Sequence, residues 1–249
     1  MSAGTNSDRS ANEPTKFRNL SDDQVWERWR ADIDRVKEDL YELFASRRAF
    51  LEVSELFRTN DRLQREGGNV WQWLLVNYAS FVVMRIRREV DGQRNVISLN
   101  QLFSEVKERP SVITRQRYLT MLRVKAGEPL YVVNDQYFTK RWARPDAVGC
   151  ADEIIDVERV ESDRRALDKA TKPVQEVGNR SIAHRQRVEP AELTLPAVDE
   201  ALRVLEELLK SYYVLLHGAS LSQAEPIPQY DTLAVYSFPW ASKQHEGDE

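Results

Sequence analysis

Apolar residues recur at intervals of three and four along most of this chain, the spacing that places them on one face of an α-helix. The clearest example lies between Thr194 and Gly218. Its stripe consists of Leu195, Val198, Leu202, Leu205, Leu208, Leu209, Tyr212 and Leu216. Thr194 is a typical helix N-cap, Pro196 fits a first turn, and Gly218 is a typical C-terminal stop. The pattern predicts an amphipathic helix with one buried face.

Further segments show the same period. Ser21 with Gln24, and Ser98 with Gln101, have the spacing of a capping box and mark two helix starts. The patterns predict helices from Ser21 to Phe57 with a break near Ser46, over Val70 to Val90, from Ser98 to Pro110, over Val112 to Val124, and over Asp152 to Val177 with a kink at Pro173. The polar segment Asn60 to Gly68 predicts a turn.

A single segment, Gly127 to Val133, has a pattern compatible with a strand. It fits equally well an extended loop that leads into a helical turn near Asn134. At least five helical patterns against this one short run predict an all-α protein. We expect an antiparallel helical bundle with little or no strand.

Composition divides the chain into three parts. Residues 1–19 mix Ser, Asn, Gly and charges and predict a mobile arm, residues 20–218 predict one helical domain, and the proline-containing residues 219–249 predict an irregular tail. The first nineteen residues lack the apolar core of a secretory signal, and no apolar stretch reaches the roughly twenty residues that span a bilayer. We therefore expect a cytoplasmic protein without a membrane partner.

The residue counts exclude several kinds of site. The single cysteine, Cys150, excludes an internal disulfide and any site with several thiolate ligands. The sequence contains no glycine-rich phosphate loop, no G-x-S-x-G and no H-E-x-x-H. We expect neither a metal nor a cofactor. A formal net charge of −4 gives no overall attraction to nucleic acid, so a basic surface would have to be local.

One segment, residues 178–185, combines residue types that suit phosphate chemistry. Imidazole transfers protons near neutral pH, and guanidinium groups bind phosphate oxygens. Arg180 and His184 would lie one turn apart on the same face of a continuing helix. From the residues alone, a structural His184 on an apolar face is the favoured interpretation, and a catalytic His184 is the alternative.

Two other features favour structural roles. The end of a predicted helix carries Arg85, Arg87 and Arg88, and cations are favoured at such ends. We prefer this structural explanation to binding of RNA phosphates by these arginines. The tryptophans of the first two predicted helices favour the core or a dimer interface over base stacking. They are Trp26, Trp29, Trp71 and Trp73.

The sequence N-R-S-I-A-H-R resembles the motif of the HEPN superfamily, in its abortive-infection AbiU-like branch. The family motif typically runs Arg-Asn-Lys-x-x-Ala-His and precedes a final amphipathic helix. The matching residues are Asn179, Ala183, His184 and Arg185, with Arg180 for the lysine and Leu193-Thr194-Leu195 at the start of the last helix. Upstream, Met84-Arg85-Ile86, Asp91 and Ile97-Ser98-Leu99 with Leu102 resemble the family's earlier helix pattern. The resemblance covers roughly residues 20 to 217.

The resemblance implies a bundle of four to five helices that usually dimerises and, in active members, a metal-independent ribonuclease site. His184 would be the general acid or base, and Asn179 would position the RNA. Arg180 would belong to the catalytic group, and Arg185 would aid RNA binding. The implied partners are RNA, a second copy of the chain and a cognate antitoxin, in a toxin or phage-defence role.

One position departs from the family pattern: its first arginine falls on Gly178, which offers no side chain. Arg180 lies four residues before His184, so a helix would bring the two nearly onto one face. Two hypotheses follow. The protein is an RNA-cleaving or RNA-binding toxin or defence protein, or it is a catalytically inactive HEPN module that serves as a dimeric scaffold or regulatory subunit.

Overall fold

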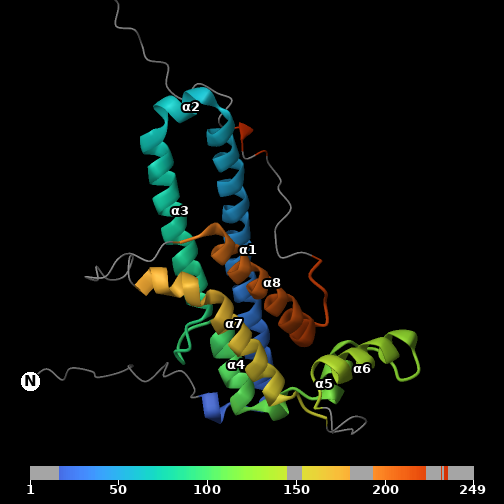
Figure 1. Ribbon diagram of the computed structural model, residues 1–249. Helices are drawn as coiled ribbons and strands as arrows, with labels where there is room; N and C mark the ends of the chain where they lie inside the picture. The colour runs from blue at the N-terminus through green and yellow to red at the C-terminus, as the bar shows by residue number, and fades with distance from the viewer. Residues whose placement is uncertain (1–16, 145–152, 180–192, 223–230, 232, 235–249) are drawn as a thin grey trace, which may run out of the picture.

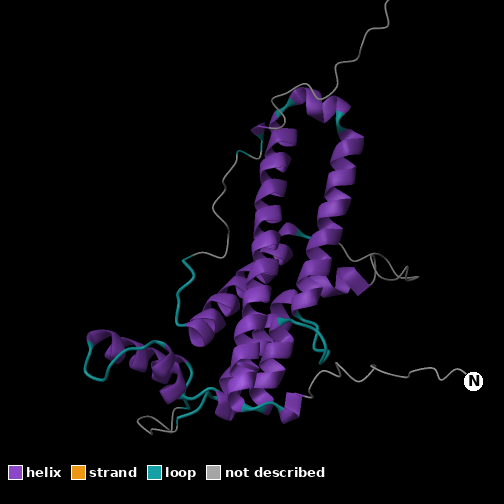
Figure 2. Ribbon diagram, turned by 180° about the vertical axis from the view of Figure 1, so that it is seen from behind, coloured by secondary structure: helices purple, strands orange, loops and turns teal. Residues whose placement is uncertain are grey.

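The computed structural model describes residues 17–144, 153–179, 193–222, 231, 233 and 234, and these contain eight α-helices. They are α1 (Asp22–Thr59), α2 (Asp61–Glu66), α3 (Gly68–Glu89), α4 (Leu99–Glu108), α5 (Arg115–Met121), α6 (Pro129–Arg141), α7 (Val157–Val177) and α8 (Leu195–His217). Two 3-10 turns occupy Phe17–Asn19 and Pro110–Val112. Among the described residues Figure 2 shows no strand, and the prediction of an all-α bundle is confirmed.

The long helix α1 is the centre of the bundle (Figure 1). It packs against α3, α4 and α8, and α7 packs against the same three helices. Helices α1 and α3 run side by side and are joined at one end by α2 (Figures 1 and 2), so their upper parts form a hairpin that projects beyond the other helices. Helices α5 and α6 pack on each other and lie to one side.

The core lies where the lower part of α1 meets α4, α7 and α8. Trp29 and Ile33 of α1 and Ile86 of α3 are fully buried there. Aromatic rings continue this core, with Phe103 4.8 Å and Trp142 4.9 Å from the ring of Tyr212. Burial of this apolar surface is the main source of stability for such a bundle.

The tryptophans divide between two environments. Trp26 and Trp29 belong to the core, as predicted. Trp71 is half-buried in the hairpin, where its ring lies 5.2 Å from that of Phe57. Trp73 is 64% exposed and does not belong to the core of this chain.

Capping side chains set the helix starts that the sequence predicts. At α1, the amide of Gln24 donates to Ser21 Oγ at 3.2 Å, and the amide of Ser21 donates to Gln24 Oε1 at 2.8 Å. At α8, the amide of Ala197 donates to Thr194 Oγ1 at 3.4 Å. Gly218 ends α8 with φ of 68°, a conformation that glycine adopts without strain.

Three local predictions are wrong. Helix α1 runs through Ser46 without a break, and the expected turn at 60–68 contains α2, because the Asn60 side chain accepts from the amides that open it. Most of the strand candidate at 127–133 belongs to α6, which begins at Pro129, where the missing N–H of proline needs no partner. The kink predicted at Pro173, by contrast, is confirmed: helix α7 continues through this residue and changes direction toward its C-terminal end (Figure 1).

A buried carboxylate joins α1 to α4. Glu105 is only 4% exposed and accepts from Trp29 Nε1 at 2.9 Å, from Arg28 Nη2 at 2.7 Å and from Gln101 Nε2 at 2.8 Å. Gln101 thereby leaves the capping box predicted for it with Ser98, which still accepts from the Gln101 amide. With three charge-assisted bonds, the buried charge is compensated.

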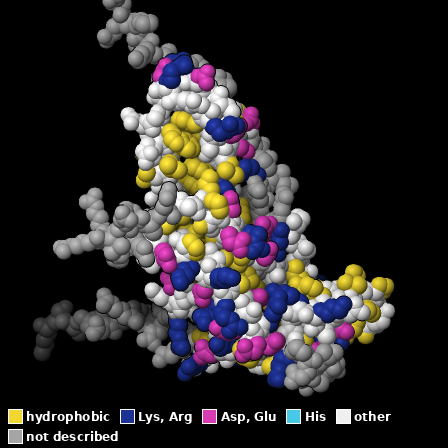
Figure 3. Space-filling view, in the orientation of Figure 1, with side chains coloured by type: hydrophobic (Ala, Val, Ile, Leu, Met, Phe, Trp, Pro, Cys, Tyr) yellow, Lys and Arg dark blue, Asp and Glu magenta, His cyan; other side chains and the backbone are white. Residues whose placement is uncertain are grey.

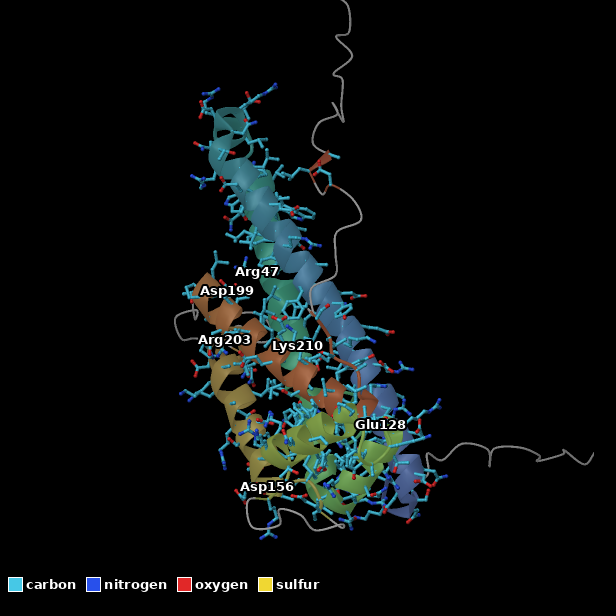
Figure 4. All side chains as sticks on the ribbon, turned by 90° about the vertical axis from the view of Figure 1, so that its right-hand side faces the viewer. Arg47, Glu128, Asp156, Asp199, Arg203 and Lys210 are labelled. Atoms are coloured by element: carbon cyan, nitrogen blue, oxygen red, sulfur yellow. The ribbon has the colours of Figure 1, made fainter. Side chains whose placement is uncertain are left out.

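A second ion pair ties the start of α8 to the middle of α1. Arg47 and Asp199 face each other in Figure 4, and Arg47 Nη2 lies 2.6 Å from Asp199 Oδ1. Arg47 is buried, whereas the Asp199 side chain is 55% exposed, so the arginine end of this pair is removed from solvent and the aspartate end faces it. The pair helps to hold α8 at the level where the hairpin begins.

Candidate functional site

Of the residues predicted to form the catalytic site, Asn179 is the one that the structure describes. It is exposed at the C-terminal end of α7, directly after Gly178. Arg180, His184 and Arg185 lie outside the described residues. The predicted grouping of Asn179, Arg180 and His184 therefore stays a prediction.

Asn179 lines an open groove of about 1340 Å³ between the C-terminal parts of α3 and α7. Helix α7 contributes Gln175 and Asn179. The other lining residues come from α3 and the residues after it: Asn77, Ser80, Phe81, Met84, Arg85, Arg87, Arg88, Val90, Asp91 and Gln93. The groove thus combines three arginines with four side-chain amides, and the two amides from α7 come shortly before residues 180–185 in the chain.

Two of the three arginines are bound to acidic residues of α1. Arg85 Nη1 lies 2.7 Å from Asp39 Oδ1, and Arg85 also pairs with Glu42. Arg88 Nη2 lies 3.0 Å from Asp39 Oδ2. These contacts hold α3 against α1 and support the structural role expected for this basic run.

Arg87 differs from its two neighbours. It is half-buried, and its side chain makes no hydrogen bond or ion pair with any residue that the structure describes. Its side chain passes over Gly178: a Cβ added to Gly178 would lie 2.8 Å from Arg87 Cδ and 2.8 Å from Val83 Cγ1. The structural role expected for the basic run therefore does not explain Arg87.

A buried acid lies behind the basic residues. Glu89 is 1% exposed, and its Oε2 accepts from the Leu99 amide at 3.3 Å. Burial raises the pKa of Glu89 to about 8, an effect that the Leu99 hydrogen bond and the charges of Arg88 and Arg85 only partly oppose. At neutral pH its carboxyl is mostly protonated and adds little negative charge near the groove.

Neither Arg87 nor Glu89 was singled out from the sequence as a site residue. A signal for Glu89 exists, because Val82, Ile86 and Glu89 follow the four-and-three spacing of the buried face of α3. Arg87 has no comparable signal, since its position depends on how α7 crosses α3.

Other classes of site find no support among the described residues. No group of three His, Cys, Asp or Glu side chains there is arranged to hold a metal ion. No described helix has an apolar stretch long enough to cross a bilayer.

The chain matches no family model, no curated protein and no solved structure. The HEPN resemblance therefore rests on the residues quoted for it above.

Proposed function

We propose that this protein is a HEPN-like RNA-binding protein that cleaves RNA without a metal ion. The observation that carries the proposal is the groove in which Arg87 and Asn179 come together, at the end of α7 where the motif begins. A guanidinium and an amide are the groups that bind a phosphodiester, and the histidine of the motif follows within five residues.

In the proposed reaction, His184 acts on the ribose 2′-hydroxyl as general base or on the leaving oxygen as general acid, while Arg180 stabilises the charge that develops on the phosphate. Asn179 positions the RNA, and Arg185 adds to its binding. A toxin or phage-defence role, with a cognate antitoxin as partner, is part of the proposal and rests on the resemblance.

The proposal includes a homodimer, for which the outer face of α3 offers the best surface. From Gly68 to Met84 no residue carries a charge, yet Val70, Trp73 and Val76 are each more than half exposed. Figure 3 shows hydrophobic side chains gathered on the upper part of the molecule, between charged side chains at its tip and others further down. Contiguous apolar patches of this kind are uncommon on monomers.

The partner that fits this face is a second copy of α3, because a surface without charges favours another surface without charges, and a two-fold axis brings the same patch onto itself. An antiparallel pairing centred between Val76 and Asn77 would set the large Trp73 of each copy opposite the small Ser80 of the other. Asn77 and Ser80 also line the groove, so the two grooves of such a dimer would adjoin.

The second candidate is a HEPN module without catalytic activity, and one observation favours it. Gly178 stands where the family carries its first arginine, and the contacts with Val83 and Arg87 leave no room for a side chain there. A protein that has lost this arginine would keep the bundle and the dimer and serve as a scaffold or regulatory subunit.

Cleavage of a labelled RNA pool in excess EDTA distinguishes the two candidates. We expect cleavage by the wild type and by His245→Ala, which removes a histidine outside the motif, and no cleavage by His184→Ala. RNA bound but not cleaved by folded wild-type protein would support the inactive module. If the folded wild type neither bound nor cleaved RNA, an RNA-directed function would be refuted.

A further inference from the structure

The close approach of α7 to α3 determines what residue 178 can be. Gly178 is buried against Val83 and Arg87, which are one helical turn apart on α3. Val83 is fully buried, whereas Arg87 is half-buried and its long side chain can change conformation. A side chain at residue 178 would therefore push Arg87 away from the end of α7. Because residue 178 is glycine, Arg87 can lie across this point, with Nη1 3.2 Å from where a Cβ would stand.

The guanidinium of Arg87 is available for a ligand. Arg85 and Arg88 are bound to Asp39, but Arg87 pairs with none of the described residues although it is half-buried. A half-buried guanidinium has lost part of its hydration, so an anion that pairs with it in the groove gains more than it would at an exposed arginine.

The neighbouring side chains favour a phosphate as that anion. Gln175 and Asn179 line the same groove and carry amide N–H groups that donate to phosphate oxygens. Asp91 is the one acidic lining residue, and its Oδ1 accepts from the Gln93 amide at 3.0 Å. The groove is open along α3, so a phosphate within a longer strand can reach it.

We infer that Arg87 binds an RNA phosphate in this groove, and that Gly178 is the residue that makes room for it. This inference rests on the proposed function and adds a residue that the motif does not contain. The guanidinium that the resemblance expects at residue 178 is supplied instead from α3. On this inference Gly178 belongs to a functional site, whereas in the inactive module the same glycine marks a lost catalytic arginine.

The test measures binding of a fluorescein-labelled single-stranded oligoribonucleotide through its fluorescence anisotropy, at several salt concentrations. Arg87→Gln removes the charge but keeps most of the side chain over Gly178. Arg94→Gln is the matched control, because Arg94 is exposed, close in sequence and absent from the groove lining. Thermal unfolding of each variant verifies that it is folded.

We expect Arg87→Gln to weaken RNA binding about tenfold, as loss of one charge-assisted contact predicts. The slope of log K against log salt should become shallower by about 0.7, the value for one phosphate contact in a single strand. Arg94→Gln should change the affinity less than twofold. Arg87→Lys should recover the salt slope but only part of the affinity, because it restores the charge without the two-pronged geometry.

The outcomes separate this inference from the proposed function. If the wild type binds RNA and Arg87→Gln behaves like Arg94→Gln, the role of Arg87 is refuted while RNA binding stands. If the wild type binds no RNA, the proposed function fails, and calorimetric titration with inorganic phosphate decides about Arg87. Phosphate binding that Arg87→Gln abolishes would keep the anion site, and no phosphate binding by the wild type would overturn it.

Discussion

Replacing Glu89 by glutamine tests whether the acid behind the groove is held protonated by burial. The folded protein raises the pKa of this carboxyl from 4.5 to about 8, mainly because burial penalises the charged form. Between these two pH values the folded chain keeps a proton that the unfolded chain releases. The free energy of unfolding must therefore fall as the pH rises through this window.

The size of the effect follows from the two pKa values. At 1.36 kcal/mol per pKa unit, the difference between 4.5 and about 8 corresponds to at most about 5 kcal/mol. Glutamine carries no charge at any pH and can still accept from the Leu99 amide. We expect Glu89→Gln to match the wild type within about 1 kcal/mol near pH 5 and to exceed it by about 3–5 kcal/mol at pH 9.

Urea unfolding followed by circular dichroism at intervals from pH 5 to pH 9 measures this difference. Because every other group titrates in both proteins, the gap between the two curves isolates Glu89. Glu38→Gln is the control, since Glu38 is exposed on α1. The difference in unfolding free energy between this variant and the wild type should not show the pH dependence expected for Glu89→Gln. Parallel curves for the wild type and Glu89→Gln would show that the buried carboxyl is not held protonated.

Three further predictions concern packing and assembly. Glu105→Leu should lower the free energy of unfolding by about 3 kcal/mol, because the buried donors of Trp29 and Gln101 and the half-buried Arg28 lose their acceptor. A loss below 1 kcal/mol in urea unfolding would contradict this. Gly178→Ala should cost about 1–3 kcal/mol in the same assay through overpacking, and adding Val83→Ala should return part of the loss. Trp73→Glu should halve the mass measured by light scattering while the chain stays folded by circular dichroism, whereas a wild-type monomer would exclude the α3 pairing.

Sequence patterns predicted those parts of the fold that local chemistry determines. Ser21 and Thr194 cap the helices that their spacing predicts, because capping joins residues only three apart. The four apolar residues Leu130 to Val133 are too few to show a period, and the outcome depended on Pro129 opening a helix. The sequence did not reveal that Trp73 is exposed, because this residue belongs to an apolar stretch of α3 that extends beyond the part covered by the bundle.

The candidate site was harder to predict because it depends on contacts between distant segments. Asn179 was identified from its motif, and the structure places it in the groove. The sequence assigned Arg85, Arg87 and Arg88 together to a helix end. Only the structure shows that Arg85 and Arg88 pair with Asp39 of α1 and that Arg87 does not. The tight packing of residue 178 on α3 could not be predicted, because the sequence shows only that this residue is a glycine and not which segment lies against it.

The packing of α1 on α8 has a consequence for biosynthesis. Translation produces α1 first, but the surface that covers much of its apolar face is made only when α8 leaves the ribosome. Until then α1 has α3 and α4 as partners, and its stretch from Arg30 to Arg47, which contacts His217, Tyr213 and Asp199 of α8, remains incompletely covered. The chain must therefore complete its folding after most of it has been synthesised, and during that interval the first helix is a natural binding site for chaperones.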